Sequence, residues 1–190
     1  MLKATYNDKE LILDILCKSF DKNNSVNYVV RQDKKRKKRI RVLMDYSFEI
    51  CYMFGQIYLS ENKDACALTL FPDRKKTSLK TILLDAKMAI SGVGLNKVTK
   101  VLKRDSKIKA SYPDHLIFYL WFIGVNPESQ HQGIGSALLK DIIAESNVAK
   151  RPIYLETSMP ENLKFYNKFG FNIYKELNFD HKLYLIKRDL

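Results

Sequence analysis

The chain has 190 residues, a length that favours a single domain over residues 1–190 with one continuous core. Hydrophobic residues make up 46% and charged residues 28%, with only five prolines and seven glycines, which excludes a disordered or fibrous protein. Subtracting 21 acidic from 33 basic residues gives a net charge of +12, so the surface should attract polyanions such as nucleic acid, acidic lipid or a phosphorylated cofactor.

Location and metal content can also be predicted from the sequence. The opening MLKATYNDKE lacks the pattern of a secretion signal, and no segment approaches the ~18 apolar residues of a membrane helix. The three cysteines and three histidines are scattered: Cys17, Cys51, Cys66, His115, His131 and His181. This spacing is not that of a zinc site. We therefore expect a cytoplasmic protein with reduced cysteines, no membrane association and no metal.

The first part of the chain predicts a strand, two helices and a hairpin. Apolar residues recur at helical spacing after Asp8, and again before Gly55, a residue that commonly ends helices. A turn-forming Glu-Asn-Lys-Asp separates two β-rich runs. The predicted elements are a strand at 1–6, helices around 9–20 and 34–54, and strands at 56–60 and 65–71.

The second part is built around one apolar run. Residues 73–114 are basic and irregular, and they predict a helical insertion with helices near 78–90 and 96–102. The run LIFYLWFIGV, 116–125, is too short for a membrane helix and predicts a central strand buried on both faces. The remaining predicted elements are a helix ending near residue 146, a strand at 153–157, a helix at 161–169, and strands near 171–177 and 182–187.

A glycine-containing junction, QHQGIGS from Gln130 to Ser136, connects the central strand to the next helix. The amino end of a helix offers unpaired N–H groups and partial positive charge, and glycine lets that backbone approach a phosphate. Other interpretations are weaker or less informative. A dinucleotide fingerprint needs glycine where Leu138 stands, and a Walker A loop needs Gly-Lys-Ser/Thr. The glycines alone are also compatible with a turn that merely joins strand to helix.

Two motifs in this order resemble those of the GCN5-related N-acetyltransferase (GNAT) superfamily. QHQGIG, Gln130 to Gly135, matches Gln/Arg-x-x-Gly-x-Gly/Ala. NLKFYNKFGF, Asn162 to Phe171, resembles the second signature, an asparagine four residues before a tyrosine and a closing Gly-Phe. The match covers about residues 116–179. The resemblance implies an α/β (α+β) fold with a mixed, mostly antiparallel sheet flanked by helices, and acetyl-coenzyme A (acetyl-CoA) bound where the central strands 116–125 and 153–157 splay apart.

The resemblance also implies which residues bind acetyl-CoA. Backbone groups of the central strand would pair with the pantetheine arm, and amides of the junction would hold the diphosphate. An asparagine of the second motif would contact the pantetheine or position the tyrosine. The implied cofactor-binding residues are Ile123, Gly124, Val125, Gln130, His131, Gln132, Gly133, Ile134, Gly135, Ser136 and Asn162.

Two residues are candidates for proton transfer. By the resemblance, Tyr166 matches the tyrosine that protonates the coenzyme thiolate; the alternative is an ordinary packing aromatic. A Ser158-x-x-Glu161 capping box predicts a helix on which Asn162 and Tyr166 share a face. Strand alternation places Glu156 beside the splay, where it can accept an amine proton through water; a salt bridge with a lysine is the alternative.

The predicted function is transfer of an acetyl group from acetyl-CoA to a primary amine, directly in a ternary complex, with a small-molecule acceptor. The rival is a non-catalytic nucleic-acid or protein-binding module on a GNAT-like fold. The basic run KKRKKRIR, 34–41, could bind a polyanion, but it lacks interleaved aromatic residues and also suits the solvated end of a packed helix.

Overall fold

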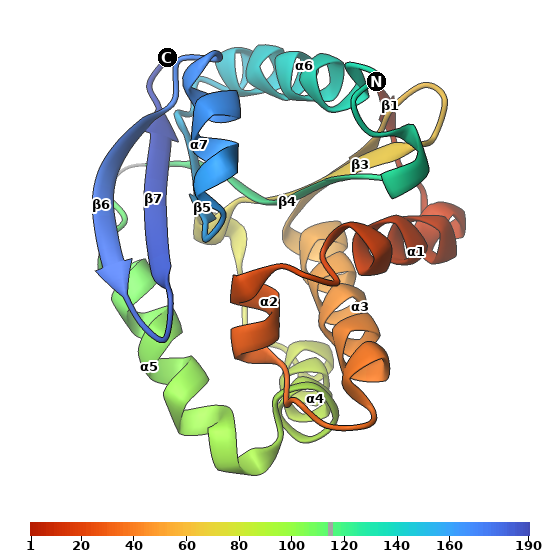
Figure 1. The fold of residues 1–190 in the computed structure, drawn as a ribbon, viewed down its shortest axis with the longest axis vertical. Coiled ribbons are helices and arrows are strands. Elements are labelled where there is room, and N and C mark those ends of the chain that lie inside the picture. Colours follow the sequence, from red (N-terminus) through yellow and green to blue (C-terminus); the bar gives the residue numbers. More distant parts are fainter. Residues whose placement is uncertain (114–115) are drawn as a thin grey trace.

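One mixed sheet organises the chain (Figure 1). The structure is a computed structural model that describes residues 1–113 and 116–190, so His115 lies outside the described residues. The sheet has seven strands in the order β1-β2-β3-β4-β5-β7-β6. They are β1 (Leu2–Lys3), β2 (Gly55–Leu59), β3 (Ala65–Leu70), β4 (Phe118–Val125), β5 (Ile153–Thr157), β6 (Asn172–Asn178) and β7 (Lys182–Arg188). All neighbours pair antiparallel except β4 and β5, which confirms the predicted mixed, mostly antiparallel sheet.

The two central strands separate soon after they meet. Their parallel register contains only Phe118 opposite Ile153 and Tyr119 opposite Tyr154. Beyond these pairs, β4 continues to Val125 beside β3, and β5 continues beside β7. The predicted splay is therefore present, and it leaves one edge of β4 without a strand partner over its carboxyl-terminal residues.

Helices cover both faces of the sheet. They are α1 (Lys9–Ser19), α2 (Asn24–Val29), α3 (Arg36–Phe54), α4 (Leu79–Lys87), α5 (Val98–Lys109), α6 (Ile134–Val148) and α7 (Pro160–Asn167). Alternate residues of β4 belong to different cores, because successive side chains of a strand point to opposite faces. Leu120 packs in the core with α6 and α7, whereas Tyr119 and Phe122 pack in the core with α1 and α3.

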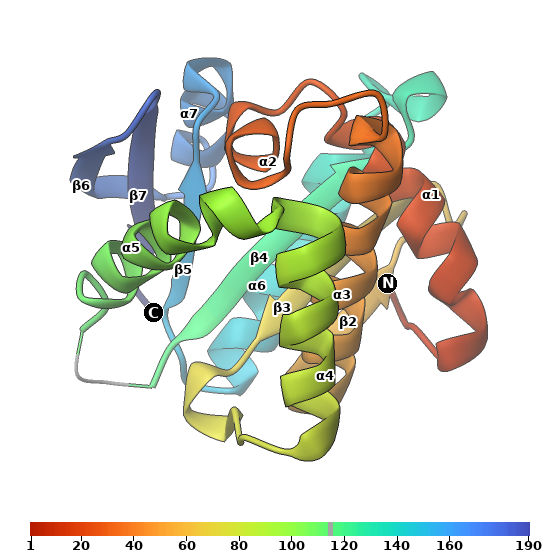
Figure 2. The same cartoon turned by 90° about the horizontal axis from the view of Figure 1, so that it is seen from below.

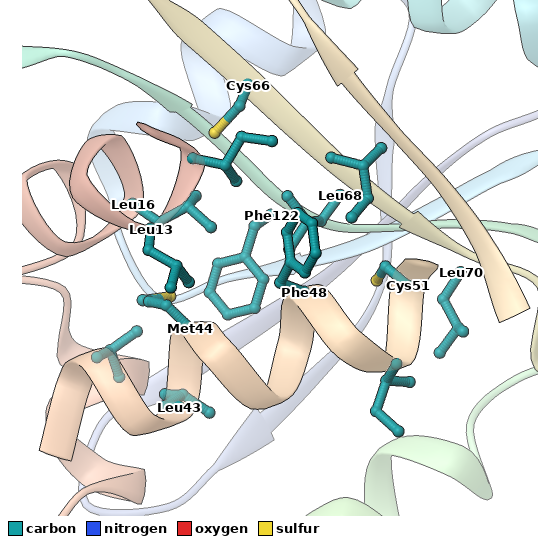
Figure 3. Close-up of a cluster of buried hydrophobic side chains, with 14 of the residues drawn as sticks. Leu13, Leu16, Leu43, Met44, Phe48, Cys51, Cys66, Leu68, Leu70 and Phe122 are labelled. Atoms are coloured by element: carbon teal, nitrogen blue, oxygen red, sulfur yellow. The ribbon is translucent and has the colours of Figure 1, made fainter. Parts of the chain in front are cut away.

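The core on the α3 side shows why these segments fold together. Apolar residues of α3 recur every three or four positions, so one side of the helix is buried. Figure 3 shows Met44, Phe48 and Cys51 of α3 lying toward Leu68 and Phe122 of the sheet. All five side chains are buried. Each fully buried leucine or phenylalanine contributes about 1.5–3 kcal/mol relative to an exposed one.

Strand β4 carries a bulge at Trp121. The register with β3 passes from Phe122 opposite Leu68 to Leu120 opposite Thr69, so Trp121 has no residue opposite it. As a result Trp121 and Phe122 both pack on the α3 side, with ring centroids 5.7 Å apart. The predicted burial on both faces is found at Phe118, Tyr119, Leu120 and Phe122, whereas Trp121, Ile123 and Val125 are only half-buried.

The segment between β3 and β4 forms the predicted helical insertion. Helix α4 continues into a π-helical turn, Met88–Val93, that packs against α3. Helix α5 is longer than predicted and reaches the β6–β7 hairpin, where its Ile108 packs against Leu183 and Leu185 (Figure 2). Across the described part of the chain, no helix combines the length and the apolar character that a membrane crossing requires.

Candidate functional site

The glycine junction forms an open amino end of α6. A short 3-10 turn follows β4, and Gly133 then caps the helix with φ of +81°. That left-handed conformation explains why glycine stands here, since other residues rarely adopt it. No side chain of the described residues caps α6, and its first turn contains no acidic residue. The amides of Ile134, Gly135 and Ser136 are therefore available to an anion, as expected for the first turn of a helix.

The surroundings of this turn are accessible. Gln130, His131, Gln132 and Gly133 are exposed, and the next three residues are half-buried. A Cβ added at Gly135 would lie 3.1 Å from Cγ2 of Val125, so Gly135 brings the start of α6 close to the end of β4. The junction and the splayed strand edge are thus neighbours, as a ligand that contacts both would require.

The end of β4 is partly covered by α1. The Ser19 hydroxyl donates to the Val125 carbonyl at 2.8 Å, and the Gln130 side chain donates to the same oxygen at 3.3 Å. A Cβ at Gly124 would meet the Ser19 hydroxyl at 3.1 Å and the Phe20 ring at 3.3 Å. Ser19 and Phe20, at the end of α1 and just after it, therefore approach the backbone of Gly124 closely.

Glu156 is held by two tyrosines. Tyr119 donates to its carboxylate at 2.7 Å and Tyr112 donates at 3.2 Å. Burial raises the pKa of Glu156 above its ordinary value, while the tyrosine hydrogen bonds and the charge of Arg104 oppose that rise. The predicted alternative, a salt bridge with a lysine, is absent from the described residues. The side chain remains half-buried, so it combines a raised pKa with access from outside.

Tyr166 lies on the opposite side of the sheet. It is 7% exposed and packs with Phe165 and Phe171 in the core shared with α6 and α7. Within the described residues its hydroxyl makes no hydrogen bond, and burial raises the pKa of that hydroxyl, so Tyr166 is a neutral potential proton donor. Its ring also packs as a core aromatic residue does.

The helix that carries Tyr166 begins differently from the prediction. Met159 is the residue before α7 and Pro160 is its first residue, so the predicted Ser158–Glu161 capping box is wrong. The Ser158 hydroxyl instead accepts a hydrogen bond from the backbone N–H of Ser25 in α2 at 3.1 Å. Asn162 lies four residues before Tyr166 on α7, as predicted, and is exposed.

Sequence reasoning missed the tyrosines that hold Glu156. Tyr119 sits within an apolar strand, where a hydroxyl requires a buried partner, and this was the available signal. Tyr112 follows α5 and reaches Glu156 only because the insertion folds against the sheet. No comparable local pattern marks Tyr112.

The described cysteines and histidines form neither a metal cluster nor an activated thiol. No group of three or more His, Cys, Asp or Glu residues suited to a metal occurs in residues 1–113 and 116–190. Cys51 and Cys66 are buried, and Cys17 is half-buried. Burial raises the pKa of Cys17 to about 11 and raises the pKa values of the other two thiols. All three are therefore protonated near neutral pH and are weak nucleophiles.

The basic run is divided between internal pairs and solvent. Arg36 pairs with Asp21, Arg39 with Asp33, and Arg41 with Glu10 and Asp14. The four lysines of the run are exposed: Lys34, Lys35, Lys37 and Lys38. The arginines thus fix the start of α3, and the lysines supply its surface charge.

A model of the family described as "Acetyltransferase (GNAT) domain" matches residues 98–173. Among solved structures, "histone acetyltransferase HPA2 and related acetyltransferase" from Corynebacterium glutamicum has a TM-score of 0.71 at 19% identity, covering 99% of this chain and 94% of that one. The C-terminal condensation domain of Ebony, in complex with beta-alanyl-dopamine, gives 0.70 at 10% identity, with 100% and 97% covered. Arylalkylamine N-acetyltransferase 2 from Aedes aegypti gives 0.64 at 12% identity, with 98% and 95% covered.

These comparisons define the class of protein. At such low identity the structural matches show the fold alone, and that fold is the GNAT fold over nearly the whole chain. Together with the family model over residues 98–173, they confirm the resemblance found in the two motifs: this part of the chain matches a GNAT domain. The family match begins in α5, so it includes part of the insertion for which the sequence motifs gave no counterpart.

Proposed function

We propose that the protein is an N-acetyltransferase that transfers the acetyl group of acetyl-CoA to a primary amine. The observation that carries this proposal is the open, glycine-capped amino end of α6 beside the unpaired edge of β4. Main-chain N–H groups at the helix start suit the coenzyme diphosphate. The free strand edge suits an extended amide-containing arm such as pantetheine, which would pair with backbone groups of Ile123 to Val125.

The proposed coenzyme contacts follow from this placement. Amides of Gln132, Gly133, Gly135 and Ser136 hold the diphosphate, with Gln130 and His131 lining the approach. The amide of Ile134 joins them, because Ile134 is the first residue of α6. Asn162 contacts the pantetheine or positions Tyr166 from the neighbouring turn of α7.

In the proposed reaction the acetyl group passes directly from the coenzyme sulfur to the amine nitrogen. The amine nitrogen attacks the thioester carbonyl carbon, and the carbon–sulfur bond breaks. The proton lost from nitrogen passes through water to Glu156, and Tyr166 gives a proton to the departing thiolate. Glu156 lies on the α3 side of the sheet and Tyr166 on the α6 side. We place the thioester between the splayed strands, so that Glu156 and Tyr166 each approach it from their own side of the sheet.

A thiol-release assay tests the proposal. The purified protein is supplied with acetyl-CoA and a panel of small primary amines, and free coenzyme thiol is measured together with the acetylated product by mass spectrometry. We expect amine-dependent thiol release without added metal. The proposal is wrong if acetyl-CoA fails to bind and no amine in the panel is acetylated.

A second candidate is a nucleic-acid or protein-binding module on the same fold. The exposed lysines of residues 34–38 and the net charge of +12 favour it. This candidate predicts strong RNA or DNA binding that weakens steeply with salt, without thiol release. The acetyltransferase ranks first because it also uses the α6 amino end and the half-buried Glu156.

A further inference from the structure

Arg104 is a buried arginine in the insertion. It lies on α5 and is 9% exposed. Its guanidinium contacts α2 through a hydrogen bond from Nη2 to the Ser25 hydroxyl at 2.8 Å. The rings of Tyr28 and Phe179 lie 6.0 and 5.8 Å from the guanidinium carbon. Arg104 therefore sits where α5, α2 and the β6–β7 turn meet.

The guanidinium is not fully satisfied. Its Nε is buried and has no hydrogen-bond partner in the described residues. Its ion pair with Asp105 is long, at 3.4 Å, and burial raises the pKa of Asp105. A buried cation normally has its donors occupied and its charge paired, because leaving them open is costly. The open Nε therefore indicates a missing acceptor.

The guanidinium edge that contains the unpartnered Nε suits a carboxylate. Nε and Nη2 form one edge of the guanidinium, and such an edge can bind the two oxygens of a carboxylate. Nη2 currently donates to the Ser25 hydroxyl, which also lies 3.4 Å from Nε2 of His181. The Arg104 edge and the Ser25 hydroxyl can thus all donate to one anion.

The position is close to the proposed reaction centre. The backbone N–H of Ser25 donates to the hydroxyl of Ser158, which follows Glu156 by two residues at the end of β5. The charge of Arg104 also acts on the Glu156 carboxyl. Arg104 and Glu156 are therefore near enough for the charge of one to act on the other.

The surrounding charge also favours an anion. Lys97, Lys100 and Lys107 share one face of the insertion with Arg104, at spacings of three, four and three residues. Lys100 and Lys107 lie over the rings of Tyr28 and Phe179, respectively, as Arg104 does. Asp180 pairs with Lys100 and offsets only part of this charge. The resulting positive field attracts anionic ligands.

We propose that the acceptor is an amine that also bears a carboxylate, and that Arg104 and Ser25 bind this carboxylate while the amine faces Glu156. This inference rests on the proposed acetyltransferase function and names its substrate class. It makes Arg104 a specificity-determining residue. A purely structural Arg104 would affect folding but would not distinguish acceptors with and without a carboxylate.

Matched acceptors test the inference. The wild-type protein is assayed for thiol release with glycine, β-alanine, γ-aminobutyrate and lysine, and with ethylamine, propylamine and the methyl esters of the same acids. We expect kcat/KM to be at least about tenfold higher for a carboxylate-bearing amine than for its matched amine or ester, the effect of one hydrogen-bonded charge. Equal or higher values for the amines and esters would overturn the inference.

Variants test whether Arg104 causes the preference for carboxylate-bearing acceptors. We expect Arg104→Gln to lower kcat/KM for the carboxylate-bearing acceptor at least about tenfold more than kcat/KM for the matched amine. Loss of the arginine charge also affects Glu156, but it does so with both acceptors, so the ratio of the two values reports carboxylate binding. Ser25→Ala, a smaller change, should lower the same preference less. Lys103→Gln is the charge control, because Lys103 is exposed on the same helix. If Arg104→Gln and Ser25→Ala both fold and both keep the wild-type preference for the carboxylate-bearing acceptor, the inference is contradicted.

Measuring coenzyme binding distinguishes failure of the carboxylate inference from failure of the proposed acetyltransferase function. Acetyl-CoA affinity is measured for each variant by calorimetry. If the wild type binds acetyl-CoA and acetylates ethylamine and β-alanine with equal kcat/KM, only the carboxylate inference fails. If it neither binds acetyl-CoA nor releases thiol with any amine, the proposed function itself fails.

Discussion

Glu156 owes its predicted reactivity to two opposing effects. Burial disfavours its charged form and raises the pKa, and the hydrogen bonds from Tyr119 and Tyr112 stabilise the charged form. A base must be deprotonated to accept the amine proton, so activity should rise with pH through the Glu156 pKa. That rise should lie above the ordinary carboxyl value of 4.5.

Variants of this cluster should separate the base from its partners. Glu156→Gln should lower kcat by about 10²–10⁴-fold with little change in acetyl-CoA affinity, because general-base catalysis contributes that much. Tyr119→Phe removes a donor to the charged carboxylate, so the acid limb of the kcat/KM profile should move to higher pH. A Glu156→Gln enzyme with wild-type kcat, or an unmoved acid limb in Tyr119→Phe, contradicts the role.

Tyr166 is tested by removing only its hydroxyl. Tyr166→Phe keeps the ring that packs against Phe171, so folding should be preserved. We expect turnover to fall by about 10²-fold or more, with a smaller effect on coenzyme affinity, if the hydroxyl protonates the thiolate. Tyr174→Phe, on β6, is the matched control. Undiminished turnover in Tyr166→Phe would leave the residue with a packing role alone.

At the scale of elements, helix α6 contributes both to the stability of the fold and to the proposed coenzyme site. Its first turn carries the amides proposed to bind the coenzyme, and Leu139 on the following turn is fully buried in the core. Leu139→Ala should lower the free energy of unfolding by about 2–5 kcal/mol, the usual cost of a buried leucine. Val148→Ala, at the 83% exposed end of the same helix, should change it by no more than about 0.5 kcal/mol. Urea denaturation measures both, and equal effects would contradict this account of α6.

Local patterns predicted most elements but not their contacts. Helical periodicity and Gly55 predicted α3, and turn chemistry predicted the β2–β3 hairpin, because these signals lie within one segment. Helix α2 was missed because it lies in a polar stretch, although the Asn23 side chain caps it by accepting from the N–H of Val26. The full length of α5 was missed because contacts with the distant β6–β7 hairpin determine it.

In the candidate site, too, features within one local motif could be predicted, and features that depend on distant segments could not. The glycine junction and Tyr166 could be found because each belongs to a short contiguous motif. The bulge at Trp121 and the pairing of Tyr112 with Glu156 depend on segments far apart in the chain. Arg104 was likewise unrecognisable in a basic stretch, since only the fold distinguishes a buried arginine from the exposed lysines around it.

At the scale of the molecule, the sheet separates the two proposed proton-transfer residues. Glu156 bonds to Tyr119 of the α3-side core, and Tyr166 belongs to the α6-side core. In the proposed mechanism, acceptor and coenzyme are bound together, and each approaches the splayed strands from the side of its own proposed catalytic residue. This arrangement requires no covalent intermediate.

Kinetics test that arrangement. Initial rates with varied acetyl-CoA and acceptor should give intersecting reciprocal plots, as expected for a ternary complex. Cys17→Ser should keep wild-type turnover, because burial raises the pKa of Cys17 to about 11 and leaves the thiol protonated. Parallel plots, or a turnover-competent acetylated cysteine detected by mass spectrometry, contradict direct transfer.

The most direct measurement of the central claim is calorimetric titration of acetyl-CoA into the wild type, Gly135→Leu and Ala144→Leu. A side chain at Gly135 would crowd Val125 and cover the first amides of α6, whereas Ala144 is exposed two turns further along the helix. We predict saturable binding to the wild type, equal affinity in Ala144→Leu, and at least about a tenfold loss in folded Gly135→Leu, equivalent to 1.4 kcal/mol. Absence of binding to the wild type, or unchanged affinity in Gly135→Leu, would contradict the account.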